Sequence, residues 1–191
     1  MIRTVKPVVL LSSGGLDSTT LAYWLRKRGH RVVPLFIHYG QHCAETEFAT
    51  LKKVLPPESS KPRKIDISDI YSGSKSRLIR EPNLWVDNME GDPLYLPYRN
   101  LLLLSTAAAF AQSNGYSQIF AGFINSNHAK EIDCSAKFFS GLERMLSEYG
   151  SVRVNMPFRE MSKLQVARVA VRLGVPIAIT YSCQASSKVP C

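Results

Sequence analysis

Short apolar runs alternate along this chain with stretches of helical periodicity. The first apolar run, Val8–Leu11, is nearly continuous, as in strands that are buried on both faces of a parallel sheet. A helical pattern follows over residues 17–28 and stops at Gly29. Strands are further predicted over residues 31–37, 64–67, 117–123 and 152–156, and helices over 45–54, 101–112, 133–149 and 162–173.

Strand–helix–strand units of this spacing form right-handed crossovers, so we predict an α/β fold with a doubly wound, mainly parallel sheet. Ligands of such sheets bind at the carboxyl ends of the strands. Helix 101–112 is apolar on every side, which predicts that it is buried. Helix 162–173 has Ser162 in the N-cap position and Gly174 just past its end. Residues 68–98 are irregular and contain several glycines and prolines, which is typical of a lid or of a flexible insertion.

The first strand runs into a loop of small residues, Ser12 to Thr19, which opens the first helix. This order suits phosphate binding, because glycine lets the backbone approach an anion and the first helical turn has spare N–H groups. Ser13, Ser18 and Thr19 add hydroxyl donors. The loop is not a Walker loop, which needs a later Gly-Lys-Ser/Thr. A serine-rich turn that only caps the helix is the structural alternative.

Composition narrows the class of protein. A chain of 191 residues with 45% hydrophobic and 20% charged residues is ordinary for one globular domain with a substantial core. The amino terminus is too polar to begin a signal peptide, and no apolar run reaches the ~20 residues of a membrane span. We therefore expect a cytoplasmic protein without membrane association. Its four cysteines are then reduced thiols or metal ligands.

The net charge of +9 is unevenly distributed. Residues 1–80 hold fourteen Lys and Arg against six Asp and Glu, whereas residues 81–150 are acidic. Excess positive charge suits a polyanionic substrate, RNA, or a surface of solvated lysines. The sequence shows no aromatic-interleaved RNA-binding motif, so a nucleic acid is the less favoured substrate.

Later segments match one known family in the same order along the chain. They are His38-Tyr39-Gly40-Gln41, Pro97-Tyr98-Arg99-Asn100, Asp133-Cys134, Met156-Pro157-Phe158 with Met161-Ser162-Lys163, and Thr180-Tyr181-Ser182-Cys183. Together with the loop string Ser-Gly-Gly-x-Asp-Ser, they resemble the 7-cyano-7-deazaguanine synthase family of the PP-loop ATP pyrophosphatases. The joint occurrence carries the resemblance, because each short motif alone would often occur by chance.

This resemblance implies one PP-loop ATP-binding domain over residues 1–191 with an adenine nucleotide alpha hydrolase-like fold. It implies an ATP-dependent ligase that joins ammonia to 7-carboxy-7-deazaguanine and forms the nitrile through an acyl adenylate and an amide. ATP, Mg²⁺ and Zn²⁺ are the implied cofactors, and a homodimer is the implied assembly. The implied substrate-binding residues are Asn127 and Asp133. The implied ATP-binding residues are Ser12, Ser13, Gly14, Gly15, Leu16, Asp17, Ser18, Thr19, His38, Tyr39, Gly40, Arg99 and Asn100.

Three charged residues are the candidate catalytic groups: Asp17, Arg99 and Lys163. Asp17 orients Mg²⁺ or braces the loop, or else only caps the helix. Arg99 neutralises developing pyrophosphate charge, and Lys163 does the same from another wall. Their structural alternatives are a surface arginine and a solvated lysine. His38 is either a nucleotide-site residue or a strand-end histidine with its own partner.

The chain also departs from the family pattern. Tyr98 stands where the family has glycine, which adds bulk beside the expected nucleotide site. Residues 125–133 keep Asp133 but lack the family's upstream aspartate and its glycine-tyrosine-proline. Since the resemblance places this segment at the deazaguanine pocket, the identity of the acceptor substrate stays open. The alternative functions are a PP-loop enzyme that adenylates another carboxylate, a protein or a tRNA base, and a nucleotide-binding module without turnover.

The carboxyl-terminal cysteines match half of a zinc site. The family's ligands run cysteine, about eight residues, then cysteine-x-x-cysteine-x-x-cysteine, and Cys183 and Cys191 supply the first two. Two thiolates do not close a tetrahedral site. We expect residues 180–191 to begin a zinc-binding tail, completed by further cysteines or by a histidine and a carboxylate from elsewhere in the chain.

Overall fold

The computed structural model describes residues 7–81, 95–124 and 135–182. Within these ranges all the strands belong to one sheet, in the order β3-β2-β1-β4-β5. Every neighbouring pair is parallel. The predicted parallel sheet is therefore confirmed. The strands are β1 (Val8–Leu11), β2 (Val32–His38), β3 (Arg63–Asp66), β4 (Gln118–Phe120) and β5 (Arg153–Asn155).

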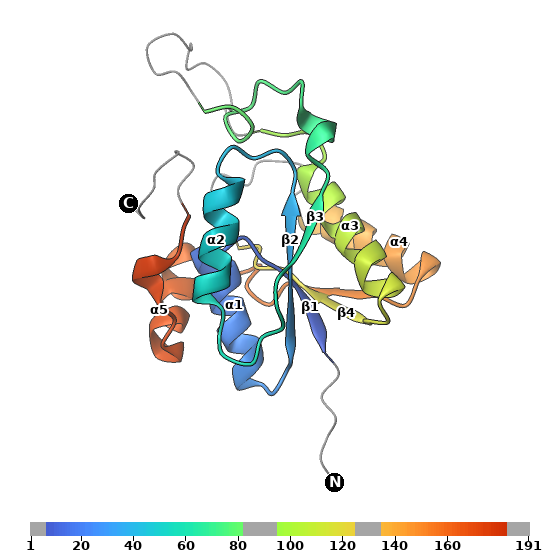
Figure 1. Ribbon diagram of the computed structural model, residues 1–191. Helices are drawn as coiled ribbons and strands as arrows, with labels where there is room; N and C mark the ends of the chain where they lie inside the picture. The colour runs from blue at the N-terminus through green and yellow to red at the C-terminus, as the bar shows by residue number, and fades with distance from the viewer. Residues whose placement is uncertain (1–6, 82–94, 125–134, 183–191) are drawn as a thin grey trace.

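Helices cover both faces of the sheet, as a doubly wound fold requires (Figure 1). One face carries α1, α2 and α5, and the other carries α3 and α4. The 3-10 helices η1 (Ser68–Tyr71) and η3 (Ile177–Ile179) lie in the connections. The α-helices are α1 (Leu16–Lys27), α2 (Ala44–Val54), α3 (Arg99–Ser113), α4 (Ala136–Tyr149) and α5 (Lys163–Leu173).

The apolar run of β1 supplies both halves of the core. Val8 and Leu10 pack in a cluster with residues of α1 and α5, including Leu21 and Val166. Val9 packs on the opposite face with residues of α3 and α4. Because successive side chains of a strand point to opposite faces, a continuous apolar run is buried on both sides.

Strand order places the ligand crevice beside β1. The chain steps from β1 to β2 on one side and returns to β4 on the other, so the winding reverses at β1. Ligands of open α/β sheets bind at the carboxyl ends of the strands at such a switch point. The loop from Ser12 to Gly15 leaves β1 there.

The sequence places most helix boundaries to within one or two residues. Ser162 caps α5 through a capping box with Gln165, and Gly174 ends it with φ of 67°. The helix predicted over 133–149 instead begins at Ala136, where the Ser135 hydroxyl accepts a hydrogen bond from the Phe138 N–H; residues 133 and 134 lie outside the described ranges.

Helix α3 is not buried on every side. Leu104 and three alanines are buried against the sheet, whereas Leu101–Leu103 are only half-buried, because the helix lies as an outer layer on one face.

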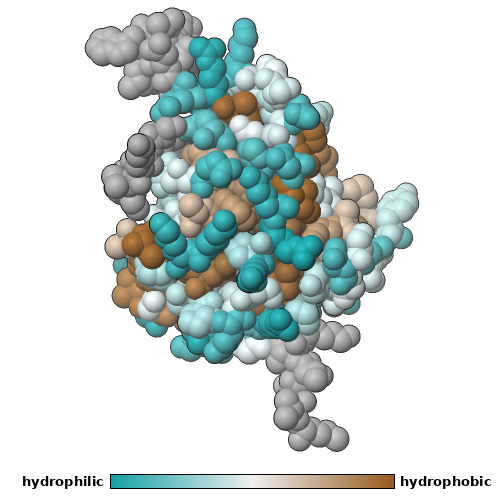
Figure 2. Space-filling view, viewed as in Figure 1, coloured by the Kyte–Doolittle hydropathy of each residue, from teal (hydrophilic) through white to brown (hydrophobic). Residues whose placement is uncertain are grey.

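In α5, Leu164 and Val171 are exposed, and Figure 2 shows apolar colour in this region. In the described ranges, the structure has no helix long and apolar enough to span a membrane.

The two described parts of the irregular segment 68–98, residues 68–81 and 95–98, pack against each other. Tyr71, Leu78 and Leu96 form a buried cluster. The Tyr71 hydroxyl donates to the Pro97 carbonyl at 2.7 Å. Residues 82–94 lie outside the described ranges, so the lid stays a prediction.

Gly14 offers a test of how this fold holds its first loop. It has φ of +80°, and an added Cβ would lie 2.8 Å from both the Glu47 carbonyl oxygen and the Leu51 nitrogen of α2. We expect Gly14→Ala to lower the free energy of unfolding by about 1–3 kcal/mol, measured by urea denaturation. Gly73→Ala is the control, since a Cβ there meets nothing within 4 Å. Equal effects of the two changes would contradict the tight packing of Gly14.

Candidate active site

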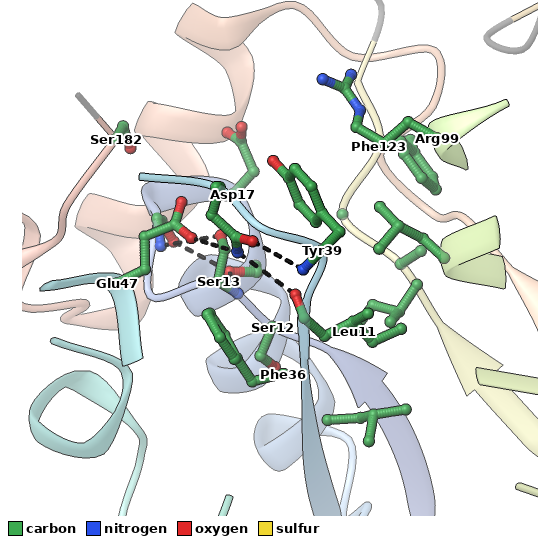
Figure 3. A pocket seen from close by; sticks show the side chains of 18 of the residues that line it. Leu11, Ser12, Ser13, Asp17, Phe36, Tyr39, Glu47, Arg99, Phe123 and Ser182 are labelled. Carbon is green, nitrogen blue, oxygen red and sulfur yellow. Dashed lines mark hydrogen bonds between the residues drawn. The ribbon is translucent and has the colours of Figure 1, made fainter. Parts of the chain in front are cut away.

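A cavity of about 430 Å³ opens at the carboxyl edge of the sheet (Figure 3). Its walls combine the end of β1 and the loop after it with residues from β2, from four helices (α1, α2, α3 and α5) and from the segments that follow β4 and η3. Polar and charged groups gather on one part of the wall and apolar side chains on another. The lining residues are Leu11, Ser12, Ser13, Gly15, Asp17, Ser18, Leu35, Phe36, Ile37, Tyr39, Gln41, Glu47, Leu78, Arg99, Leu103, Ala121, Gly122, Phe123, Lys163, Tyr181 and Ser182.

Hydroxyl groups hold the loop in shape. The Ser13 N–H donates to the Ser18 hydroxyl at 3.3 Å, and that hydroxyl donates to the Gly15 carbonyl at 3.2 Å. The Gly15 N–H donates to the Ser13 hydroxyl, also at 3.3 Å. The loop therefore folds on itself at the start of α1, with its backbone at the helix terminus where an anion is favoured.

Gly122, which lies outside the loop, also shapes this site, although no motif in the sequence indicated it. Gly122 follows β4, and an added Cβ there would lie 3.2 Å from the backbone carbon of Asp17 and the nitrogen of Ser18. A side chain at this position would require the chain after β4 and the first turn of α1 to move apart by a few tenths of an ångström. The available signal was a glycine inside the predicted strand 117–123, which often marks close backbone approach.

Two of the three candidate catalytic residues form an ion pair. The Lys163 ammonium donates to both carboxylate oxygens of Asp17, at 2.9 and 2.8 Å. The two residues are 146 positions apart, at the beginnings of α5 and α1. The pair fixes a cation beside the loop, and its lysine is half-exposed. The structure thus favours the bracing role for Asp17.

Arg99 approaches the cavity from the first turn of α3, on the side of Phe123 (Figure 3). Burial raises the pKa of the nearby Tyr39 well above its ordinary value; the charge of Glu47 adds to this rise and that of Arg99 opposes it. Tyr39 therefore keeps its proton at neutral pH and remains a hydrogen-bond donor in the cavity.

A buried polar network behind Tyr39 was missed at the sequence level. The Gln41 side-chain carbonyl accepts from the Tyr39 N–H at 2.9 Å, while its amide donates to the Glu47 carboxylate at 3.0 Å. Burial raises the pKa of Glu47, and the hydrogen bond from Gln41 opposes that rise. Gln41 lies in a recognised motif, but the helical pattern around Glu47 does not indicate that the Glu47 carboxylate turns inward.

Several predicted ATP-binding residues do not line the cavity. They are Gly14, Leu16, Thr19, His38, Gly40 and Asn100. Thr19 and Asn100 are almost fully buried, at 1% and 2% exposure. His38 hydrogen-bonds Asp66 through Nδ1 at 2.9 Å; hydrogen bonds from Ser68, and then from His38, hold the pKa of Asp66 well below its ordinary value. Direct nucleotide contact by these side chains stays a prediction.

Tyr98 has an unusual backbone. It precedes α3 with φ of 58° and ψ of 18°, the left-handed conformation that glycine adopts most readily. Its side chain is 70% exposed. The position where the family resemblance expects glycine is therefore a left-handed position, and here a tyrosine occupies it.

Four predicted residues lie outside the described ranges: Asn127, Asp133, Cys183 and Cys191. Within the described ranges, the structure contains no group of three or more histidine, cysteine, aspartate or glutamate side chains arranged to hold a metal ion. Cys43, a buried residue at the start of α2, is not in a disulfide, and its thiol hydrogen-bonds the Glu47 carboxylate.

The fold and the loop after β1 define the chain as a doubly wound α/β protein with a PP-loop fold. Two solved structures share the fold. A predicted subunit of a tRNA methyltransferase from Methanocaldococcus jannaschii matches with a TM-score of 0.58 and 16% identity, over 87% of this chain and 75% of the other. A 4-thiouridine synthetase, solved with RNA and bound ATP, matches with a TM-score of 0.57 and 18% identity, over 97% of this chain and 46% of the other.

The chain belongs to the family described as queuosine biosynthesis protein QueC, whose model matches residues 6–191. Among its relatives, the 7-cyano-7-deazaguanine synthase of Archaeoglobus fulgidus is 32% identical over 96% of this chain and 79% of its own length. The protein of that name from Thermoplasma volcanium is 29% identical over 97% of this chain and 81% of its own length. The family that the sequence motifs predicted is confirmed.

The buried Glu47 gives a prediction about pH. Because its pKa is raised in the folded state, the wild type loses stability relative to Glu47→Gln as the pH rises above 4.5, the ordinary value. The glutamine retains an oxygen to accept from Gln41 and carries no buried charge. We expect Glu47→Gln to unfold at higher urea concentration than wild type at neutral pH, with the difference shrinking in acid.

The control for loss of one negative charge is Glu143→Gln, at an exposed position of α4. A difference between Glu47→Gln and wild type that is constant with pH, or that grows in acid, would contradict the burial of this carboxylate.

Proposed function

We propose that this protein is a 7-cyano-7-deazaguanine synthase, an ATP-dependent ligase that converts 7-carboxy-7-deazaguanine and ammonia into the nitrile. The observation that carries the proposal is the cavity at the loop, with Lys163, Asp17 and Arg99 around it, in a chain of the QueC family. Its curated relatives with this name support the substrate.

The proposed chemistry uses ATP twice. A carboxylate oxygen of the substrate attacks the α-phosphorus of ATP, the bond to pyrophosphate breaks, and an acyl adenylate forms. Ammonia attacks the acyl carbon, loses a proton and displaces AMP, which leaves the amide. A second ATP adenylates the amide oxygen, and loss of AMP and of the amide protons leaves the nitrile. No covalent enzyme intermediate is needed, so catalysis rests on positioning and charge stabilisation.

The loop and its cations then have separate tasks. Backbone N–H groups of the loop and the Ser13 hydroxyl hold the phosphates at the terminus of α1. Lys163 and Arg99 stabilise the negative charge that develops on pyrophosphate from two sides of the cavity. Asp17 keeps Lys163 in place. The half-buried Leu103 and Phe123, which belong to the apolar cluster on the α3 side, offer apolar surface to a flat base.

Mg²⁺ fits the oxygen donors at this site. Magnesium ions in nucleotide sites commonly use one or two carboxylates together with phosphate oxygens and water. Asp17 offers such a carboxylate beside the loop, but both of its oxygens accept from Lys163, so Mg²⁺ would have to share or replace that ion pair. Bound Mg²⁺ would supply further charge neutralisation of the phosphates. We propose that Asn127 and Asp133 bind the deazaguanine; neither lies in the described ranges.

Product analysis separates this proposal from its alternatives. Purified enzyme with ATP, Mg²⁺, ammonia and 7-carboxy-7-deazaguanine should release pyrophosphate and AMP and form the nitrile. Pyrophosphate release only with a protein, RNA or another carboxylate would favour a divergent adenylating enzyme. ATP binding without release under any of these conditions would favour a binding module.

The charged residues around the loop give a kinetic prediction. Asp17→Ala and Arg99→Ala should each lower kcat at least ~10²-fold, since Arg99 acts on transition-state charge directly and Asp17 positions Lys163, which does the same. Asp69→Ala and Arg144→Ala, at exposed positions, are the matched controls. Urea denaturation should show only modest loss of stability. A rate close to wild type in either test variant would remove that residue from the catalytic set.

We further propose that Cys183 and Cys191 bind Zn²⁺ with ligands still to be identified. Structural zinc takes four thiolate or imidazole ligands, and its binding energy becomes folding energy for the segment that holds it. Elemental analysis of purified natural protein should find about one zinc per chain, lost in Cys183→Ser and kept in Cys43→Ala. Less than ~0.2 zinc per chain in intact protein would refute a tight site.

The homodimer implied by the sequence resemblance stays a prediction. A second copy packed on α5 would cover Leu164 and Val171, which are 61% and 70% exposed. Sedimentation of the purified protein measures the assembly directly.

A further inference from the structure

The segment Thr180–Ser182 lies directly against the loop at the other end of the chain. Tyr181 is 2% exposed, and its N–H donates to the Gly14 carbonyl at 3.1 Å. The Leu16 N–H donates to the Ser182 hydroxyl oxygen at 3.2 Å, across 166 positions of sequence. Two backbone groups of the loop are thus bound by this late segment, and Figure 3 shows Ser182 at the edge of the cavity.

Gly15 makes room for this segment. A Cβ added at Gly15 would lie 3.3 Å from both the Ser182 hydroxyl and the Tyr181 carbonyl oxygen, which is tighter than most real contacts of a Cβ. The absence of a side chain at Gly15 therefore lets the late segment pack closely against the loop. The segment belongs to the wall of the cavity as much as the loop does.

The Ser182 hydroxyl has an unused hydrogen-bonding capacity. A serine hydroxyl accepts with its lone pairs and donates with one proton. Its oxygen already accepts from Leu16, one of the backbone donors that a helix start leaves without a partner inside the helix. Among the described residues, the structure shows no acceptor for its proton. Ser182 lines the same cavity as Ser13, Asp17 and Lys163, where the triphosphate is proposed to lie.

We propose that Ser182 is a phosphate-binding residue, which accepts from the Leu16 N–H and donates its own proton to a phosphate oxygen of ATP. This inference rests on the proposed ATP site. Because binding energies are reciprocal, the same contact makes bound ATP tighten the attachment of residues 180–182 to the loop. Residues 180–182 then form part of the phosphate site together with the loop, in addition to connecting η3 to the residues that follow.

Calorimetric titration with α,β-methylene ATP and with adenosine tests this assignment. Ser182→Ala should weaken binding of the triphosphate about tenfold or more, the usual effect of losing a hydrogen bond to a charged group. Adenosine should bind as it does to wild type. Ser182→Thr, which keeps the hydroxyl, should restore most of the affinity. Ser147→Ala, in the exposed last turns of α4, is the control and should bind like wild type.

Other outcomes overturn the inference in distinguishable ways. Unchanged triphosphate affinity in Ser182→Ala would show that the hydroxyl does not contact phosphate. Tighter binding would show that it competes with phosphate for the Leu16 N–H, and equal losses for triphosphate and adenosine would show a structural effect. A wild type that binds no triphosphate at all would refute the proposed function itself.

Hydrogen exchange on the wild-type protein gives a test that needs no variant. The triphosphate analogue should slow exchange of the Tyr181 amide, which donates to Gly14, and adenosine should not. An unchanged exchange rate at Tyr181 in the saturated complex would contradict the coupling between the segment and the phosphate site.

Discussion

The close approach of backbone to backbone around the first loop is the constraint on which the site depends. Gly14 lies against the backbone of α2, and Gly122 lies against the first turn of α1. A side chain at either position would separate elements that have to touch for the cavity to exist. These contacts bring the start of α1, the end of β2 and the end of β4 around one space, where the spare N–H groups of a helix start meet cations from elsewhere in the chain.

The titratable groups around this space are either paired with a partner or kept neutral. Lys163 is held by Asp17, Tyr39 keeps its proton because of burial, and Glu47 is enclosed behind them. The ion pair presents a lysine whose position is fixed before a ligand arrives, which lowers the reorganisation that charge stabilisation requires. The carboxylate of Glu47 is instead directed at Gln41, so its negative charge is met by an amide donor.

The sequence could predict the sheet and most helix ends because periodicity and caps are local signals. It could also predict the loop, since its glycines and hydroxyls are contiguous. A motif does not tell apart neighbouring residues that a helix turns to different sides. Successive helical residues point about 100° from each other, so Ser18 faces the cavity while Thr19 enters the core, and Arg99 faces it while Asn100 does not. Glu47 and Ser182 reach the cavity only through tertiary packing, which no local pattern records.

The attachment of Tyr181 to Gly14 also has a consequence for biosynthesis. The loop is synthesised well before this partner segment, since 166 positions separate Leu16 from Ser182. At the usual pace of translation, roughly 5–20 residues per second, the loop waits on the order of ten seconds or more for that partner. A chain still on the ribosome therefore has an open phosphate loop without its second wall. Nucleotide capture at the complete site therefore has to await the synthesis of residues 180–182, and a chain that stops before them would lack its second wall.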